Sequence, residues 1–226
     1  MMHTLWSIKG GSGVTVVAAA LGAVLAERDG RAVVVDLCGD QPAALGLAEP
    51  AGPGVTDWLA APDGGERSLT RLLVPVDDRL ALLPRGPRRG WPEERVAELA
   101  TALATLGFAV VIDAGLADSG NGPHDLLLGQ LRDAGTSLLV TRACYLGLRR
   151  AFGLDAPVDG VVLVRDVGRA LDRADVQAVL RLPVLVTVDW DPAIARAVDA
   201  GLLVRRLPRR LARSLGGLLP LDEVAA

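Results

Sequence analysis

The chain has almost no lysine and very few aromatic residues. It contains 24 basic residues in 226, of which one, Lys9, is lysine and the other 23 are arginine. Aromatic residues make up 3% of the chain and hydrophobic residues 50%, so the core must be built mainly from Ala, Val and Leu. Such a core suits a buried parallel sheet between Ala- and Leu-rich helices.

Cysteine and long apolar segments are also scarce. Cys38 and Cys144 lie far apart and lack metal-ligand spacing, which indicates reduced thiols in a cytosol and not a disulfide scaffold. The longest apolar stretch, 14–26, is too short to span a bilayer, and a glycine-rich turn precedes it where a signal peptide would be basic. We therefore expect a cytoplasmic chain that forms a single domain over residues 1–226.

Short β-branched segments alternate with longer helical ones along the chain. Strands are predicted at 3–8, 32–36, 79–84, 108–113, 137–141, 160–164 and 183–188. Helices are predicted at 14–28, 55–60, 93–106, 171–180 and 192–200. Strands that alternate with helices form βαβ units with right-handed crossovers. The predicted fold is a doubly wound α/β domain, with a mostly parallel sheet flanked by helices in three Rossmann-like layers.

The segment Lys9–Thr15, which we call the phosphate loop, joins the first predicted strand to the first predicted helix. Its glycines let the backbone wrap around an anion, and the helix that begins near Val14 offers its positive end to the same anion. Thr15 can supply a hydroxyl ligand to Mg²⁺. The alternative is an ordinary glycine-rich turn, which the strand before and the helix after make less favoured.

The phosphate loop resembles that of the ParA/MinD family of P-loop ATPases, which reads KGGxGK followed by Thr or Ser. This chain matches at every defined position except Val14, which stands where the family has the lysine that contacts the β- and γ-phosphates. The resemblance implies a P-loop NTPase fold with ATP or ADP and Mg²⁺ as cofactors. It implies nucleotide binding by Gly10, Gly11, Ser12, Gly13, Val14, Thr15 and Val16.

The resemblance also implies catalytic and partner contacts. Lys9 corresponds to the lysine that reaches across a homodimer to the partner's nucleotide. Asp36 ends the second strand, as does the family's acidic residue near the attacking water. The family often has a second acid two residues later, where this chain has Cys38, and Asp40 is the candidate to compensate. The candidate catalytic residues are therefore Lys9, Asp36 and Asp40.

Two later strands carry further parts of the resemblance. Val110–Asp113 is similar to a Walker B strand, whose acid holds magnesium through water, and a plain strand end is the alternative. Thr15 and Asp113 are therefore the candidate metal residues. Val161–Arg165 resembles the adenine-side strand, but Val164 replaces the family's Asn. The pattern as a whole is closest to the CpaE/TadZ or septum-site-determining branch.

The departures at Val14, Cys38 and Val164 bear on activity. Loss of a lysine ammonium from a partly buried phosphate site removes several kcal/mol of charge stabilisation, which predicts weak or absent ATP hydrolysis. We expect an intracellular positioning protein of the pilus, secretion, septum-site or chromosome-partition type, with a degenerate nucleotide site. An active partition ATPase and a nucleotide-free scaffold are the alternatives, so whether the chain is an enzyme stays open.

The net charge of −3 restricts any contact with nucleic acid to a local basic patch. The candidate is an amphipathic segment near the end of the chain, in which leucines alternate with arginines. We favour a packed last helix with solvated arginines, and contact with a membrane surface or with DNA is the alternative use. The arginines are Arg205, Arg206, Arg209, Arg210 and Arg213.

Overall fold

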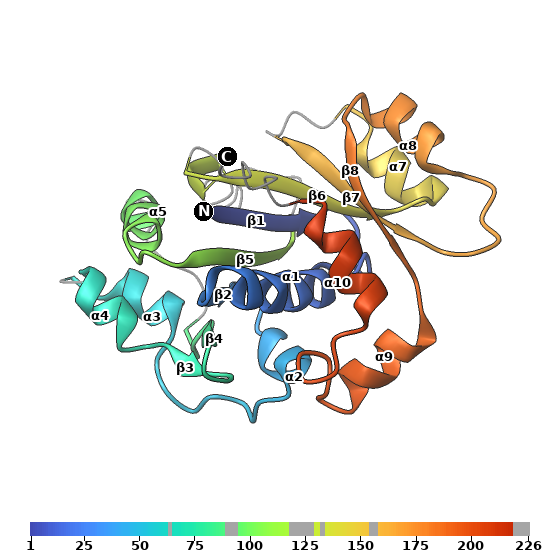
Figure 1. Ribbon diagram of the computed structural model, residues 1–226. Helices are drawn as coiled ribbons and strands as arrows, with labels where there is room; N and C mark the ends of the chain where they lie inside the picture. The colour runs from blue at the N-terminus through green and yellow to red at the C-terminus, as the bar shows by residue number, and fades with distance from the viewer. Residues whose placement is uncertain (63–64, 89–94, 118–128, 132–133, 154–157, 219–226) are drawn as a thin grey trace, which may run out of the picture.

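The computed structural model describes residues 1–62, 65–88, 95–117, 129–131, 134–153 and 158–218. Over these residues, the strands form one eight-stranded sheet in the order β3-β4-β2-β5-β1-β6-β7-β8 (Figure 1). The strands are β1 Met2–Ser7, β2 Ala32–Asp36, β3 Val74–Pro75, β4 Leu80–Leu83, β5 Ala109–Leu116, β6 Thr136–Arg142, β7 Gly160–Arg165 and β8 Val184–Asp189.

The pairing of the strands confirms the predicted fold class. Every neighbouring pair is parallel except β3 and β4, which are antiparallel. The order reverses direction at β1, so the loops after β1, β2 and β5 meet at one edge. In a doubly wound sheet, ligands bind at such a switch point, outside the carboxyl ends of the strands.

Helices cover both faces of the sheet (Figure 1). On one face lie α1 Val14–Asp29, α2 Gln41–Leu45, α9 Pro192–Asp199 and α10 Arg209–Gly216. On the other face lie α3 Val55–Ala60, α4 Glu66–Thr70, α5 Val96–Ala104, α7 Tyr145–Ala151 and α8 Arg173–Leu180. The predicted three-layer arrangement is therefore confirmed.

Strand β2 shows why this sequence forms a buried central strand. Val34 packs into the core cluster on the α1 side, whereas Val33 and Val35 pack into the cluster on the α5 side. Because both faces are covered, the strand is an unbroken apolar run and does not alternate. Gly22 of α1 lies over β2 so closely that a Cβ there would overlap Val34, so the glycine allows the close approach.

Some element boundaries differ from the predicted ones. Strand β5 runs past the expected end at Asp113 to Leu116, because it pairs with Trp6 and Ser7 beyond a bulge at Ala114 of β5. Helix α5 is described from Val96, and residues 93–94 of its predicted span lie outside the described residues. Helix α2 was not predicted, since five residues are too few to show a helical period.

Arg209, Arg210 and Arg213 lie on the last described helix, α10, which begins after Pro208, and Arg205 and Arg206 lie in the turn before it. Leu211 and Leu215 are buried in the core cluster beside α1, which confirms the prediction of a packed helix. All five arginines are exposed, and no ion pair to any of them occurs within the described residues. Among the helices that the structure describes, none is both long and apolar enough to cross a membrane.

Buried His3 makes folding stability depend on pH. Burial, helped by the N-terminal ammonium and Arg28, lowers the pKa of His3 from 6.5 to about 4. Below pH 6.5, His3 is therefore protonated in the unfolded chain but stays neutral in the folded protein. The free energy of unfolding falls as the pH drops from 6.5 to 4. The loss should reach about 3 kcal/mol relative to a His3→Leu variant. Urea unfolding of both proteins at pH 7 and pH 4.5 measures it, and parallel pH profiles would contradict the prediction.

Candidate functional site

The phosphate loop connects β1 to α1, and two serine side chains donate hydrogen bonds to its backbone. The hydroxyl of Ser12 donates to the carbonyl of Lys9 at 2.6 Å, and the hydroxyl of Ser7 donates to the same carbonyl at 3.1 Å. Gly11 and Gly13 have φ of 77° and 97°, in the left-handed region that favours glycine. The sharp turn at the end of β1 therefore favours glycine at positions 11 and 13.

The N-terminus of α1 is free to receive an anion. Its N-cap, Gly13, has no side chain to cap the helix, and no acidic residue lies in the first turn. The first N–H groups of this 16-residue helix thus have no side-chain cap, and the helix dipole adds positive potential. Beside Gly10 and Gly11, the space that a Cβ would fill is open. This loop fits a phosphate group.

A cavity of about 530 Å³ lies over the phosphate loop. The ends of β2, β4 and β5 complete its wall, and they contribute Leu37, Cys38, Asp40, Arg85, Ala114, Gly115 and Leu116. Every residue predicted to bind the nucleotide, from Gly10 to Val16, lines the cavity. The structure therefore brings these residues together around one space.

Lys9 and Asp36 do not line this cavity. Lys9 is half-buried as a residue, and its Nζ makes an exposed contact with the carbonyl of Gly10 at 3.2 Å. Asp36 is fully buried, and its carboxylate accepts hydrogen bonds from the backbone N–H groups of Cys38, Gly39 and Gln41. Asp36 thus holds the turn that leads to Asp40, and Asp40 lines the cavity.

Asp113 lies on β5, which pairs with β1, the strand that leads into the phosphate loop. It is paired in register with Asp36 across β5 and β2, and it is fully buried. Its carboxylate accepts hydrogen bonds from the Gln41 amide at 2.8 Å and from the Gly115 N–H at 3.1 Å, and hydrogen bonding by the Thr15 side chain lowers its pKa. The Gln41 amide also donates to the carbonyl of Thr15, so it joins the two predicted metal residues.

Burial controls the charge of these acids. Removal from water raises the pKa of Asp113 to about 6, and it also raises the pKa of Asp36. Asp36, Cys38 and Asp113 place their ligand atoms within 4.8 Å of one another. However, burial and the neighbouring acids raise the pKa of the Cys38 thiol, so it stays protonated. The oxygens of Thr15 and Asp113 fit Mg²⁺, which prefers hard ligands, and the thiol does not.

Two of the replaced residues place apolar side chains at the phosphate loop. Val14 is 6% exposed and packs into the core cluster while lining the cavity. Val164, near the end of β7, is 7% exposed, and its side chain is 3.7 Å from the position of a Cβ on Gly13. Neither side chain can donate a hydrogen bond to a phosphate or a base.

Sequence reasoning missed two residues of the site. Gln41 donates to Asp113 and also to the carbonyl of Thr15 at 3.0 Å, so it ties α1 to β5. Arg85, two residues after β4 ends, lines the cavity. Their positions could have indicated both residues, because each follows the carboxyl end of a strand near the switch point of the sheet.

The comparisons with known proteins agree with this geometry. Solved structures with the same fold include a ParA family ATPase from Chlorobium tepidum TLS (TM-score 0.75, 19% identity, 95% of this chain and 96% of that chain). The MinC:MinD cell division protein complex from Aquifex aeolicus has a TM-score of 0.77 at 17% identity, over 98% of both chains. The septum site-determining protein MinD with Mg-ADP from Pyrococcus horikoshii OT3 has a TM-score of 0.71 at 20% identity, over 96% of this chain and 93% of that chain.

The fold and the site thus define a ParA/MinD-type P-loop ATPase fold. The model of the family described as cellulose biosynthesis protein BcsQ matches residues 1–114, which include the phosphate loop, Asp36 and Asp113. The match spans half of the chain, and the chain belongs to this family. The comparison with curated proteins found no match.

Proposed function

We propose that the chain binds ATP or ADP with Mg²⁺ in the cavity over the phosphate loop and hydrolyses ATP slowly or not at all. The observation that carries this proposal is the uncapped N-terminus of α1 at the cavity, where the Gln41 amide joins Thr15 to Asp113 and Val14 lies in the cavity wall. These residues support an anion site with metal ligands, in which Val14 stands in place of the family's lysine.

Each part of the site has a role in this proposal. Backbone N–H groups of the phosphate loop and of the first turn of α1 bind the phosphates. Thr15 and Asp113 would hold Mg²⁺, which neutralises phosphate charge when bound. Gln41 keeps the Asp113 carboxylate oriented through its amide. Val14 contributes no charge to the transition state, and transition-state charge stabilisation is the main source of catalysis in phosphoryl transfer.

The exposed apolar side chains support homodimerisation across the nucleotide face. Five of them follow the carboxyl ends of β5, β6, β7 and β8, on the edge that carries the phosphate loop. They are Leu116 (51% exposed), Tyr145 (73%), Leu146 (45%), Val167 (88%) and Trp190 (45%). Apolar groups gathered on one edge suit a protein interface. A second copy that covers this edge would also bring Lys9 to the partner's cavity.

The biological role that we propose is positioning of other machinery. The chain would recruit a larger assembly to a place in the cell, as a single cytoplasmic domain whose dimer state depends on nucleotide. Because the family description names cellulose biosynthesis, one candidate cargo is polysaccharide synthesis machinery. Pilus, septum and partition machinery are the other candidates from the ParA/MinD pattern.

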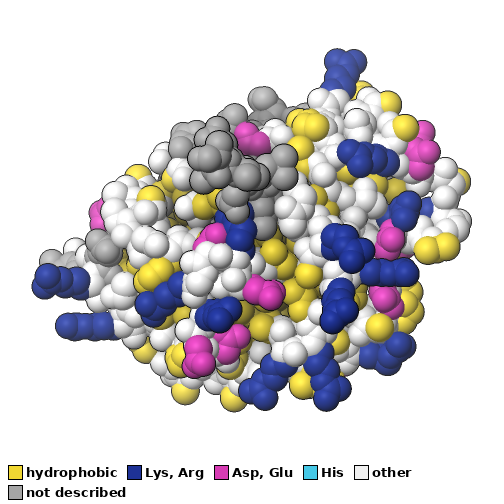
Figure 2. Space-filling model, viewed as in Figure 1, with side chains coloured by type: hydrophobic (Ala, Val, Ile, Leu, Met, Phe, Trp, Pro, Cys, Tyr) yellow, Lys and Arg dark blue, Asp and Glu magenta, His cyan; other side chains and the backbone are white. Residues whose placement is uncertain are grey.

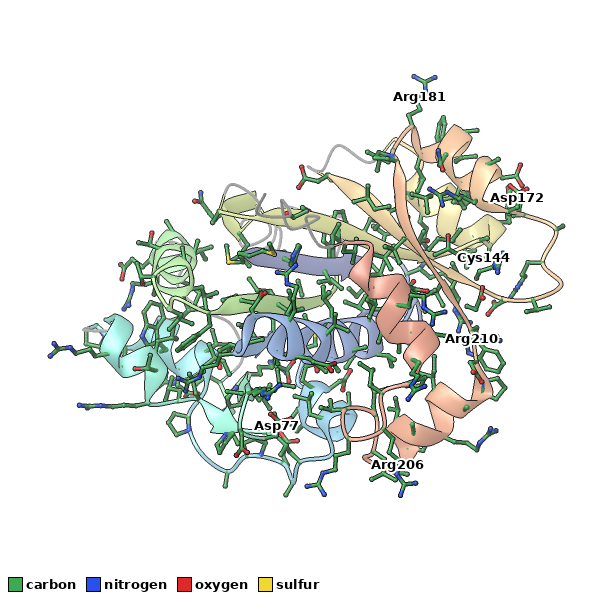
Figure 3. The ribbon with its side chains drawn as sticks, viewed as in Figure 1. Asp77, Cys144, Asp172, Arg181, Arg206 and Arg210 are labelled. Atoms are coloured by element: carbon green, nitrogen blue, oxygen red, sulfur yellow. The ribbon has the colours of Figure 1, made fainter. Side chains whose placement is uncertain are left out.

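Exposed arginines suit an anionic surface as a further contact. Figure 2 shows basic side chains projecting over the region of α9 and α10, and Figure 3 labels Arg206 and Arg210 there. Lipid headgroups and DNA phosphates share the chemistry that arginine recognises. Co-sedimentation with anionic liposomes and with DNA, each at low and high salt, distinguishes the two. Absence of binding to either would leave α10 as a packed helix alone.

One experiment tests the proposal against its alternatives. ATP and ADP are titrated with Mg²⁺, and phosphate release and oligomer size are followed in the same samples. Binding with dimerisation and little phosphate release is the expected result. Phosphate release as fast as in an intact ParA/MinD ATPase would show an active enzyme. No binding of either nucleotide would show a scaffold that does without nucleotide.

Lys9→Ala is expected to weaken ATP-dependent dimerisation while the monomer still binds ADP. The Lys9 Nζ lies on the exposed side of its own loop, so its loss removes no contact from its own cavity. The dimer should weaken by about 10-fold or more, as for one lost lysine–phosphate pair. Sedimentation velocity with ATP measures this, and Arg79→Ala, an exposed arginine at the opposite edge of the sheet, is the control. Unchanged dimerisation in Lys9→Ala would contradict the prediction.

A further inference from the structure

Arg85 enters the phosphate cavity from the end of β4. Its side chain lies over Gly39, 3.6 Å from the position that a Cβ would take there. Its Nη1 donates to the carbonyl of Cys38 at 3.3 Å, which fixes the guanidinium at the wall of the cavity. Arg85 is thus anchored on the loop that follows β2, opposite the phosphate loop.

The charge of Arg85 is not balanced within the described part of the chain. No carboxylate there forms an ion pair with it, and its buried Nε has no hydrogen-bond partner. The nearby Arg88 differs, because its Nε pairs with Asp57 at 3.3 Å. A half-buried guanidinium without a carboxylate partner is costly, so its place at a cavity wall favours an anionic ligand.

We propose that Arg85 binds the phosphate tail of the nucleotide and supplies the cation that the phosphate loop lacks at Val14. This inference rests on the proposed function. Arg85 and the N-terminus of α1 line the same cavity from different elements, so a phosphate between them meets positive charge on both sides. The guanidinium has five donors, and one bond to Cys38 leaves others to form paired hydrogen bonds with phosphate oxygens.

The inference is tested by binding of inorganic pyrophosphate and of ADP to the full chain, measured by calorimetry without ATP turnover. Arg85→Ala should lower both affinities by about 10-fold or more, and Arg85→Lys should recover part of the loss. The matched control is Arg79→Ala. Arg79 flanks the other end of β4, is exposed, and lines a separate pocket at the opposite edge of the sheet.

The outcomes separate this inference from the proposed function. If the wild type binds ADP and Arg85→Ala binds it equally well, Arg85 has no part in phosphate binding and the inference fails alone. If the wild type binds neither ADP nor pyrophosphate, the proposed function fails as well. Thermal unfolding without ligand checks that each variant is folded, and an affinity loss shared by Arg79→Ala would also overturn the inference.

Discussion

Gly46→Ala is expected to lower the free energy of unfolding by about 3 to 5 kcal/mol. Gly46 ends α2 with a φ of 73°, where an alanine is strained. A Cβ on Gly46 would also overlap the carbonyl oxygen of Gly201 and lie 2.9 Å from its carbonyl carbon. Both atoms belong to the backbone, so a side-chain rotation cannot relieve the contact. The loop after α9 would have to move away from α2.

Gly30→Ala is the matched control for this prediction. Gly30 ends α1 with a φ of 80°, but the space for its Cβ is open. Its replacement should therefore cost only the left-handed strain, about 1 to 2 kcal/mol. Urea unfolding of both variants measures the difference. Equal losses would mean that the Gly46–Gly201 approach contributes nothing to stability.

The fold could be predicted from the sequence because its signals are local. The segment AVVVD at 32–36 is β-branched and apolar without alternation, as a central parallel strand with both faces buried must be. The predicted 55–60 helix also has the observed bounds. The antiparallel strand β3 was not predicted, because two residues give no periodic signal.

Sequence patterns indicated the parts of the candidate site that lie within one segment, namely the phosphate loop and the apolar run that ends at Asp113. The phosphate loop is one segment, so its glycines and Thr15 carry a readable spacing. Gln41 and Arg85 meet this loop from the ends of other strands, and no spacing within the sequence relates them to it. The pairing of Asp36 with three backbone N–H groups likewise depends on the path of the loop after β2.

Val14→Lys is expected to raise the affinity for ATP by about 10-fold in the wild-type background. Val14 lines the cavity at the first position of α1, so a lysine there can place its stem against the core and its ammonium beside the phosphates. Val14→Met is the control, since methionine has a similar length without the charge. Calorimetric titration with ATP and Mg²⁺ measures the affinity of each variant.

The same substitution should have a larger effect when Arg85 is replaced by alanine. If both cations serve the same phosphates, Val14→Lys should raise ATP affinity by about 100-fold in that background, because the cavity wall then offers the phosphate tail no arginine at position 85. Equal gains in the two backgrounds would mean that the residues act independently and that Arg85 does not stand in for the lysine. No gain in either background would contradict phosphate binding at the N-terminus of α1. A double-mutant cycle in ATP affinity thus decides whether Arg85, which follows β4, supplies the positive charge that the phosphate loop lacks at Val14.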